Sequence, residues 1–225
     1  MSLVNLKTIK DQMGIEIRSL CNRLGLEHLN VIDCHGHLGQ YGGFNVPMGD
    51  AASMVDTMDR LGIDLICISS HVAIGPDFRY GNDLTLEAMQ SYPDRFVGYC
   101  VVNPNYSDEM ISELERCCGQ LGMSGIKLHP SASGYPIDGP NHWPAYEYAD
   151  IYGLPVLIHC GGVQAIEGCV NMAKKYQNAK FLVGHAGGDY AGICHAIHQA
   201  SELNNLFLDF TGSRPYFGIL ERACN

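Results

Sequence analysis

Short apolar runs alternate with longer segments of helical period along most of this chain. The runs are rich in Val, Ile, Leu and Phe over four to eight residues, which is typical of strands that are buried on both faces. They predict strands at 31–37, 63–71, 95–103, 125–129, 155–160, 180–185 and 206–211. The segments between these runs predict helices. One of them, DAASMVDTMDRLG, ends at Gly62, a residue suited to a helix C-cap.

Regular alternation of strands and helices predicts parallel strands joined by right-handed crossovers. Two architectures have this order: an open doubly wound sheet and a closed barrel. No G-x-G-x-x-G follows the first strand and no G-x-x-x-x-G-K-[ST] occurs in the chain. A dinucleotide-binding fold therefore loses its main support. Two Gly- and Pro-rich segments, 71–83 and 130–144, predict long loops that would build a substrate pocket.

The N-terminal segment has the pattern of an amphipathic helix. Its apolar residues step by three or four positions, which places them on one face: Leu6, Ile9, Met13, Ile17, Leu20 and Leu24. No linker, low-complexity tract or charge block divides the rest of the chain. We therefore expect residues 1–29 to form a helical extension packed on a single domain of residues 30–225.

Length, net charge and cysteine content limit which kinds of protein and which binding partners are compatible with the sequence. A length of 225 residues is normal for one α/β barrel. The formal net charge of −10 argues against binding to nucleic acid or to an anionic membrane. The ten cysteines include no C-x-x-C pair, and several lie in apolar runs, as Cys67 and Cys100 do. Together with the absence of a long apolar run, this predicts a cytoplasmic protein with free thiols.

Histidine or lysine ends five of the seven predicted strands. In a barrel all strand C-termini meet on one face, where active sites are built. The residues concerned are His35, His37, His71, Lys127, His129, His159 and His185. Residues i and i+2 of a strand point the same way, so His35 and His37 can converge on one cation, and neutral imidazole suits zinc and similar metals.

Each of these residues also has a structural interpretation. An H-x-H pair arises easily by chance in a chain with ten histidines, and His35 and His37 could be polar turn residues. His159 and His185 could be structural histidines satisfied by local hydrogen bonds, and His71 and His129 could merely line a pocket. The other histidines, His28, His142, His195 and His198, are expected to be structural or solvated. The coincidence of several histidines at strand ends favours a metal site.

Five motifs, in this order and spacing, carry a family resemblance: VIDCHGHLG, RFVGYCVVNP, GIKLHP, GLPVLIHCGG and FLVGHAGG. The chain resembles the amidohydrolase superfamily, and within it the amidohydrolase-related (family 2) metal-dependent hydrolases, over about residues 30 to 220. The resemblance implies an α/β fold of the TIM-like (β/α)8 type, with residues 30–225 as the barrel. It also implies a mono- or binuclear centre of divalent metal, most simply Zn²⁺, at the C-terminal face.

The resemblance assigns roles residue by residue. His35, His37 and His159 match metal ligands. His185 matches a histidine that binds a second metal or positions water and substrate, and we expect it to be catalytic. Lys127 matches a position at which some members carry a carboxylated lysine, but here a plain lysine that binds a substrate carboxylate is favoured. His71, His129 and Arg214 are expected to orient the substrate as well.

The chain departs from the family pattern at its end. The family has an aspartate on strand 8, which binds metal and acts as general base, whereas this chain ends at GILERACN, before a strand 8. Asp209 lies on strand 7 and does not match that position; a role near the site or at the core edge is favoured over a role as substitute ligand. We therefore expect a sheet that does not close between strands 7 and 1.

The expected function is a metal-dependent hydrolase that uses metal-activated water on an amide, ester or lactone carbonyl of a small, anionic substrate. One alternative is a metal-dependent decarboxylase of an aromatic-derived acid on the same barrel, and another is a catalytically inactive metal-binding barrel. The expected partners are a small-molecule substrate and further copies of the chain in a homo-oligomer, without nucleic acid or membrane.

Overall fold

The structure is a computed structural model, and it describes residues 29–43, 45–75, 77–212 and 216–224. Of the segments with a predicted role, residues 1–28 of the N-terminal extension and Arg214 lie outside the described residues. No helix in the described part of the chain combines the length and the apolar character needed to cross a membrane.

Seven parallel strands form one sheet in chain order, β1 to β7, so that each strand pairs with the strands before and after it. All seven predicted strands are present, and each end of six of them lies within two residues of its predicted position. The last is shorter than predicted, because pairing stops at Leu208. The bounds are β1 Ile32–Leu38, β2 Leu65–Ser70, β3 Phe96–Val101, β4 Gly125–Leu128, β5 Pro155–His159, β6 Lys180–Gly184 and β7 Leu206–Leu208.

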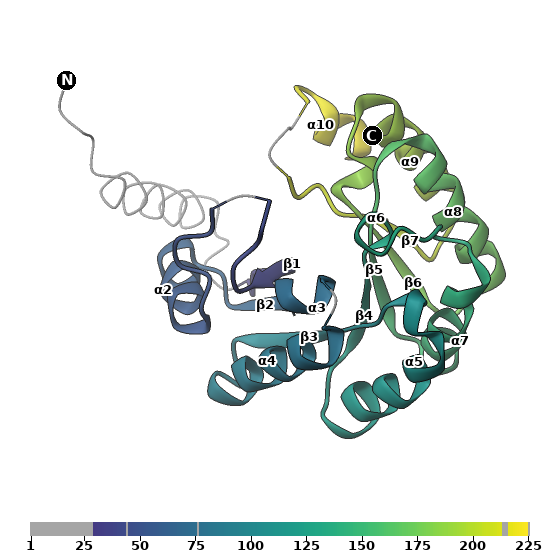
Figure 1. Ribbon diagram of the computed structural model, residues 1–225. Coiled ribbons are helices and arrows are strands. Elements are labelled where there is room, and N and C mark those ends of the chain that lie inside the picture. Colours follow the sequence, from purple (N-terminus) through teal and green to yellow (C-terminus); the bar gives the residue numbers. More distant parts are fainter. Residues whose placement is uncertain (1–28, 44, 76, 213–215, 225) are drawn as a thin grey trace.

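The long helices follow the strands and lie in an arc on the outer side of the sheet (Figure 1). This arrangement is that of a TIM-like barrel. The α-helices are α2 Ala51–Leu61, α3 His71–Ile74, α4 Phe78–Ser91, α5 Ser107–Leu114, α6 Pro130–Ser133, α7 Trp143–Tyr152, α8 Gly162–Lys175, α9 Tyr190–Glu202 and α10 Ile219–Cys224. Short helical turns are η1 Pro104–Tyr106, η3 Pro140–His142 and η4 His185–Gly187, and a π-helical turn, η2, spans Glu115–Gln120.

The main core lies between the central strands and the helices outside them. Alternate strand residues, such as Ile126 and Leu128 of β4 and Val156 and Ile158 of β5, belong to it and are fully buried. The intervening residue Lys127 is also buried but is not part of this cluster. Since side chains alternate across a strand, the residues that bear chemistry point to the inside of the curl.

The caps of α2 confirm the sequence prediction for its C-terminal end. The Asp50 side chain accepts a hydrogen bond from the backbone N–H of Ser53 at the N-cap. Gly62 ends the helix with a φ of 73°, a left-handed conformation that glycine adopts without steric cost. The local sequence is therefore sufficient to place this helix.

The two segments predicted as long loops are partly helical. Residues 71–83 contain α3 and the start of α4, where the Asp77 side chain accepts from the backbone N–H of Tyr80. In residues 130–144, Pro130 and Pro140 open α6 and η3. Proline is favoured in the first helical turn, where its missing N–H costs nothing, so here it marks helix starts.

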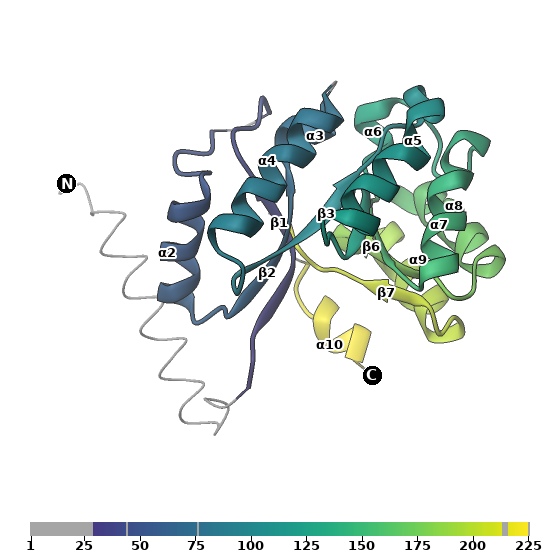
Figure 2. The same ribbon diagram turned by 90° about the horizontal axis from the view of Figure 1, so that it is seen from below.

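The sheet remains open between its two edge strands, β1 and β7. Neither pairs with the other in the described residues, and no eighth strand is seen there, as expected from the sequence. The chain that follows β7 nevertheless passes beside β1 (Figure 2), where Asp209 contacts His35. The seam between the edge strands is therefore bridged by side chains rather than by a backbone ladder.

Candidate metal centre

His35 and His37 of β1 point their Nε2 atoms at each other. The two nitrogens are 3.1 Å apart. Two nitrogens that each bind one ion at 2.0–2.1 Å would, at this separation, subtend an angle of about 100°, close to the tetrahedral value. The parity predicted from the H-x-H spacing is thus realised in the strand.

The opposite ring nitrogens of this pair are held by acceptors. Nδ1 of His35 lies 2.5 Å from Oδ2 of Asp209. Nδ1 of His37 lies 3.3 Å from the carbonyl oxygen of Ser69 and 3.1 Å from its hydroxyl. When both Nδ1 atoms donate, both Nε2 lone pairs face the same point, which is the arrangement that binds a cation.

The local backbone of β1 helps to aim these rings. The register with β2 shifts between Asp33 and Gly36, and such irregularities re-aim side chains next to functional sites. Between the two histidines, a Cβ on Gly36 would lie 2.5 Å from Cδ1 of Ile66. The glycine of H-G-H is therefore required by close packing of β1 on β2.

A second group of histidines comes from the end of β5, the start of η4 and the chain after β4. Nδ1 of His159 lies 3.1 Å from Nε2 of His185, and the His129 ring stacks on that of His159 with centroids 4.0 Å apart. The ring centroids of His35 and His185 are 5.1 Å apart. The four histidines predicted as ligands are therefore brought together at one end of the strands.

His185 has a strained backbone. Its φ is 59°, and that of Ala186 is 47°, both in the left-handed region that non-glycine residues seldom occupy. Strain of this kind costs of order 1–3 kcal/mol and clusters at active sites. Here it turns the chain sharply after β6, into η4, and places His185 beside His159.

Lys127 of β4 is fully buried and lies among the histidines. Its Nζ is 3.0 Å from Nε2 of His35. Burial lowers the pKa of Lys127 to about 7, although the negative charge of Asp209 acts in the opposite direction. The amine can therefore be neutral or charged near neutrality.

His71, the first residue of α3, lies at the rim of the group. Its ring stacks on that of His37 with centroids 4.7 Å apart, and its Nδ1 is 3.0 Å from the carbonyl oxygen of Gly39. The structure thus places every predicted site residue that it describes in one neighbourhood.

Burial keeps most of these imidazoles neutral. It lowers the pKa of His37 to about 2, of His159 to about 3 and of His129 to about 4, and the charge of Lys127 adds to the shift at each. Burial also lowers the pKa of His35, despite its hydrogen bond with Asp209. Neutral imidazole is the form that binds metal.

Asp209 remains ionised in this setting. Burial raises its pKa, but hydrogen bonds from His35 and Thr211 outweigh this effect and bring it down to about 2. Neither Thr211 nor Ser69 was predicted from the sequence. Thr211 lies two residues after Asp209, and this i, i+2 spacing is the one signal by which it could have been found.

The donor set fits a divalent ion at the His35–His37 pair. The two neutral Nε2 atoms converge, and the Nδ1 atom of each ring is hydrogen-bonded to an acceptor, which is the usual arrangement of histidine ligands. Within the residues that the structure describes, no group of three His, Cys, Asp or Glu side chains is close enough to enclose an ion. A third ligand from His159 or His185 therefore requires a rotation of its ring toward the pair.

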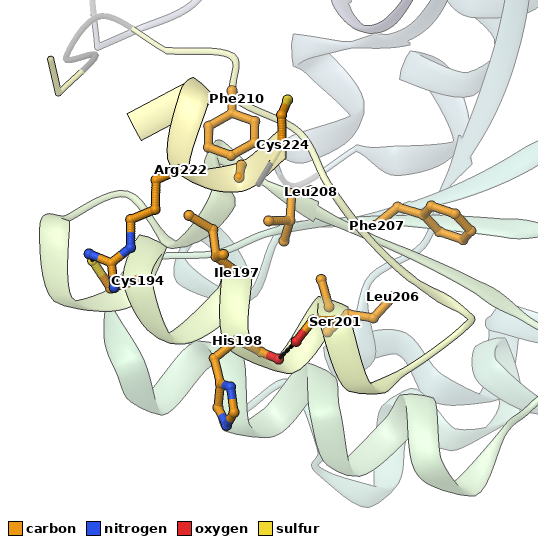
Figure 3. Close-up of a pocket in the computed structure, with 12 residues that line it drawn as sticks. Cys194, Ile197, His198, Ser201, Leu206, Phe207, Leu208, Phe210, Arg222 and Cys224 are labelled. Carbon is orange, nitrogen blue, oxygen red and sulfur yellow. Dashed lines mark hydrogen bonds between the residues drawn. The ribbon is translucent and has the colours of Figure 1, made fainter. Parts of the chain in front are cut away.

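A separate pocket of about 670 Å³ lies between α9, β7 and α10 (Figure 3). Ile197, Leu206, Leu208 and Phe210 give it an apolar lining, and the predicted metal ligands are not among the described residues that line it. It is therefore distinct from the candidate metal centre.

Comparison with known proteins finds similar sequences and structures. A hydratase from a Sphingobium species, 2-keto-4-carboxy-3-hexenedioate hydratase, is 24% identical over 168 residues, which are 57% of this chain and 49% of the hydratase. The chain thus matches about half the length of this relative.

Solved structures show the same fold. The structure of 4-oxalomesaconate hydratase from Rhodopseudomonas palustris aligns with a TM-score of 0.60 at 22% identity, covering 80% of this chain and 73% of the other. A dihydroxybenzoic acid decarboxylase from a Polaromonas species, solved with bound manganese and an inhibitor, aligns with a TM-score of 0.66 at 18% identity, covering 86% and 82%.

The sequence profile of the family described as Amidohydrolase matches residues 32–223, from the first residue of β1 into α10. The match spans both histidine groups and the Asp209 segment. The chain therefore belongs to the amidohydrolase family.

Proposed function

We propose that this chain carries the histidine centre of a metal-dependent enzyme that directs water at a small carboxylate-bearing substrate, with hydrolysis as the reaction first tested. The convergence of His35 and His37, each with its outer nitrogen held by an acceptor, carries the proposal. A divalent ion bound there would lower the pKa of bound water toward neutrality and polarise a substrate carbonyl. Zinc is the ion favoured by the imidazole ligands.

The chain's own residues have distinct tasks in this proposal. His35 and His37 would hold the ion, and His159 would serve as a further ligand. His185, 3.1 Å from His159, holds or moves a proton at Nε2. His129 keeps the His159 ring in place by stacking on it.

Lys127 supports an anionic substrate. A buried amine next to the histidines can pair with a carboxylate once the substrate excludes water. The names of the related hydratases and of the decarboxylase all denote carboxylated compounds. His71 at the rim is placed to contact the same substrate.

Decarboxylation is the second candidate. It is favoured by the same buried amine, which can hold the carboxylate that leaves, and by the structural similarity to a dihydroxybenzoic acid decarboxylase. The two reactions differ in product, because only decarboxylation releases carbon dioxide.

The test is metal content and turnover of wild-type protein, His37→Ala and His195→Ala. We expect about one bound zinc or manganese ion per wild-type chain, its loss in His37→Ala, and no change in His195→Ala, whose ring pairs with Glu167 on the helical surface. Turnover is assayed on carboxylated lactones, esters and amides, on unsaturated dicarboxylates and on hydroxybenzoates, with carbon dioxide measured separately. Full metal occupancy in His37→Ala would contradict the ligand assignment.

A further inference from the structure

The segment that follows β7 contacts two histidines that come from opposite sides of the open seam. Asp209 and Thr211 contact His35 of β1, and Thr211 also contacts His185 of η4. We propose that Asp209 and Thr211 form a clamp that fixes the tautomer and orientation of His35 and His185, which makes Asp209 a positioning residue rather than a metal ligand. This inference rests on the metal-dependent function proposed above.

Both carboxylate oxygens of Asp209 already take part in hydrogen bonds within the protein. Oδ1 accepts from the backbone N–H of Thr211 at 3.0 Å. Oδ2 accepts from the Thr211 hydroxyl at 2.8 Å and lies 2.5 Å from Nδ1 of His35. Oδ2, which contacts both Thr211 and His35, would have to give up one of these contacts to bind an ion directly. We therefore infer that Asp209 acts on the ion through His35.

Thr211 extends the clamp to the second histidine. Its carbonyl oxygen lies 2.9 Å from Nδ1 of His185 and must accept from it, because a carbonyl cannot donate. This leaves the lone pair of His185 at Nε2, toward His159. The Thr211 hydroxyl is also 3.0 Å from Nδ1 of His35. One three-residue segment thus sets the proton position on two rings.

The location makes the clamp effective. The His35 and Asp209 side chains are 2% and 5% exposed, so their contact is shielded from water and hardly screened. Strands β1 and β7 share no backbone ladder in the described part of the sheet. The clamp therefore fixes the chain after β7 relative to β1, as backbone hydrogen bonds would do between paired strands.

The direct test is the tautomer of His35 in metal-free protein, read from its side-chain ¹⁵N shifts by NMR and assigned with His35→Ala. We expect the Nδ1–H form in wild-type protein and a shift toward the Nε2–H form in Asp209→Ala. Asp209→Asn, which keeps an acceptor oxygen, should give an intermediate result. Glu113→Gln, a change at a buried carboxylate outside the site, should leave the tautomer unchanged.

The second readout is metal affinity, measured by competition with a chelator. Loss of such an outer partner typically lowers affinity by about 10–100-fold. We expect this loss in Asp209→Ala with an unchanged ratio of ion to chain at saturation, whereas His35→Ala should lose the ion. Thr211→Val, which leaves the Asp209 carboxylate in place, should also weaken metal binding. It replaces Asp209→Ala as the test if that variant does not fold.

The outcomes separate the clamp from the proposed function. An unchanged His35 tautomer in Asp209→Ala, or the loss of an oxygen ligand from the metal's X-ray absorption spectrum in that variant, would overturn the clamp. A wild-type protein that binds no metal would overturn the proposed function, while the tautomer experiment would still decide the clamp.

Discussion

At the scale of single residues, Lys127 shows the conflict between stability and function most directly. Its amine is fully buried and lies beside His35, and taking a cationic group out of water costs several kcal/mol unless it is paired. Nothing in the packing of β4 requires a lysine, since its neighbours Ile126 and Leu128 are apolar. We therefore attribute this lysine to the chemistry of the proposed site.

Replacing Lys127 with Met should stabilise the protein and abolish turnover. The methionine keeps most of the volume and removes the buried amine, so we expect a gain of about 1–4 kcal/mol in the free energy of unfolding. Urea unfolding of the metal-free wild-type protein and of Lys127→Met measures this difference in the free energy of unfolding. The control Lys180→Met, at an exposed position of β6, should change stability by less than about 0.5 kcal/mol. A lower free energy of unfolding in Lys127→Met would contradict this prediction, because it would show that the amine stabilises the folded protein.

At the scale of elements, a polar network joins α4, α5 and β3. The Glu113 side chain of α5 is fully buried and accepts from the Asn82 amide at 2.8 Å and from Arg116 at 2.7 Å. Asn82 in turn accepts from the backbone N–H of Val101 at 2.9 Å. The network fixes both helices against a strand of the barrel without contact with the histidines.

Glu113→Gln should destabilise this network in a pH-dependent way. Burial raises the pKa of Glu113, but hydrogen bonds from Arg116, Asn82 and Cys117 outweigh it, so the pKa in the folded state lies below its ordinary value of 4.5. The carboxylate therefore stabilises the fold fully above pH 4.5, and this contribution is lost as the pH falls through the folded pKa.

The expected loss in Glu113→Gln is about 1–3 kcal/mol at pH 7, shrinking below pH 4.5. Denaturant unfolding of both proteins from pH 7 to pH 3 measures it. A difference between the two proteins that is independent of pH would contradict the assignment to the ionised carboxylate.

At the scale of the whole molecule, the open seam leaves apolar residues on both edge strands in contact with solvent. Ile32 of β1 is 59% exposed and Phe207 of β7 is 47% exposed. Parallel sheets normally have both faces and edges covered, and an exposed edge strand favours association with another chain. The homo-oligomer expected from the sequence remains a prediction, and we propose this seam as its contact.

Phe207→Lys should reduce self-association, because a charge on the edge of β7 opposes pairing. Light scattering coupled to size-exclusion chromatography, at two protein concentrations, measures the change. Ile151→Lys is the matched control, since Ile151 is 74% exposed on α7, away from the seam. Equal behaviour of the two variants would exclude β7 as the contact.

Much of the fold was predictable because it depends on short-range pattern. The strands and the C-cap of α2 follow from periodicity and from the preference of Gly62 for a positive φ. The helices in residues 71–83 and 130–144 were missed, because Pro130 and Pro140 begin helical turns as readily as they break them. The shortening of β7 was missed because Phe210 extends the alternating pattern of residues 206–211 beyond Leu208, where strand pairing stops.

The sequence by itself determined which histidines share a face, since strand parity and the common C-terminal end of parallel strands are local rules. Only the tertiary structure decided what holds them. The contact of His35 with Asp209 spans 174 positions of sequence, and that of His37 with Ser69 spans 32. Both depend on sheet curvature, strand register and the path of the chain across the seam, which no local pattern encodes.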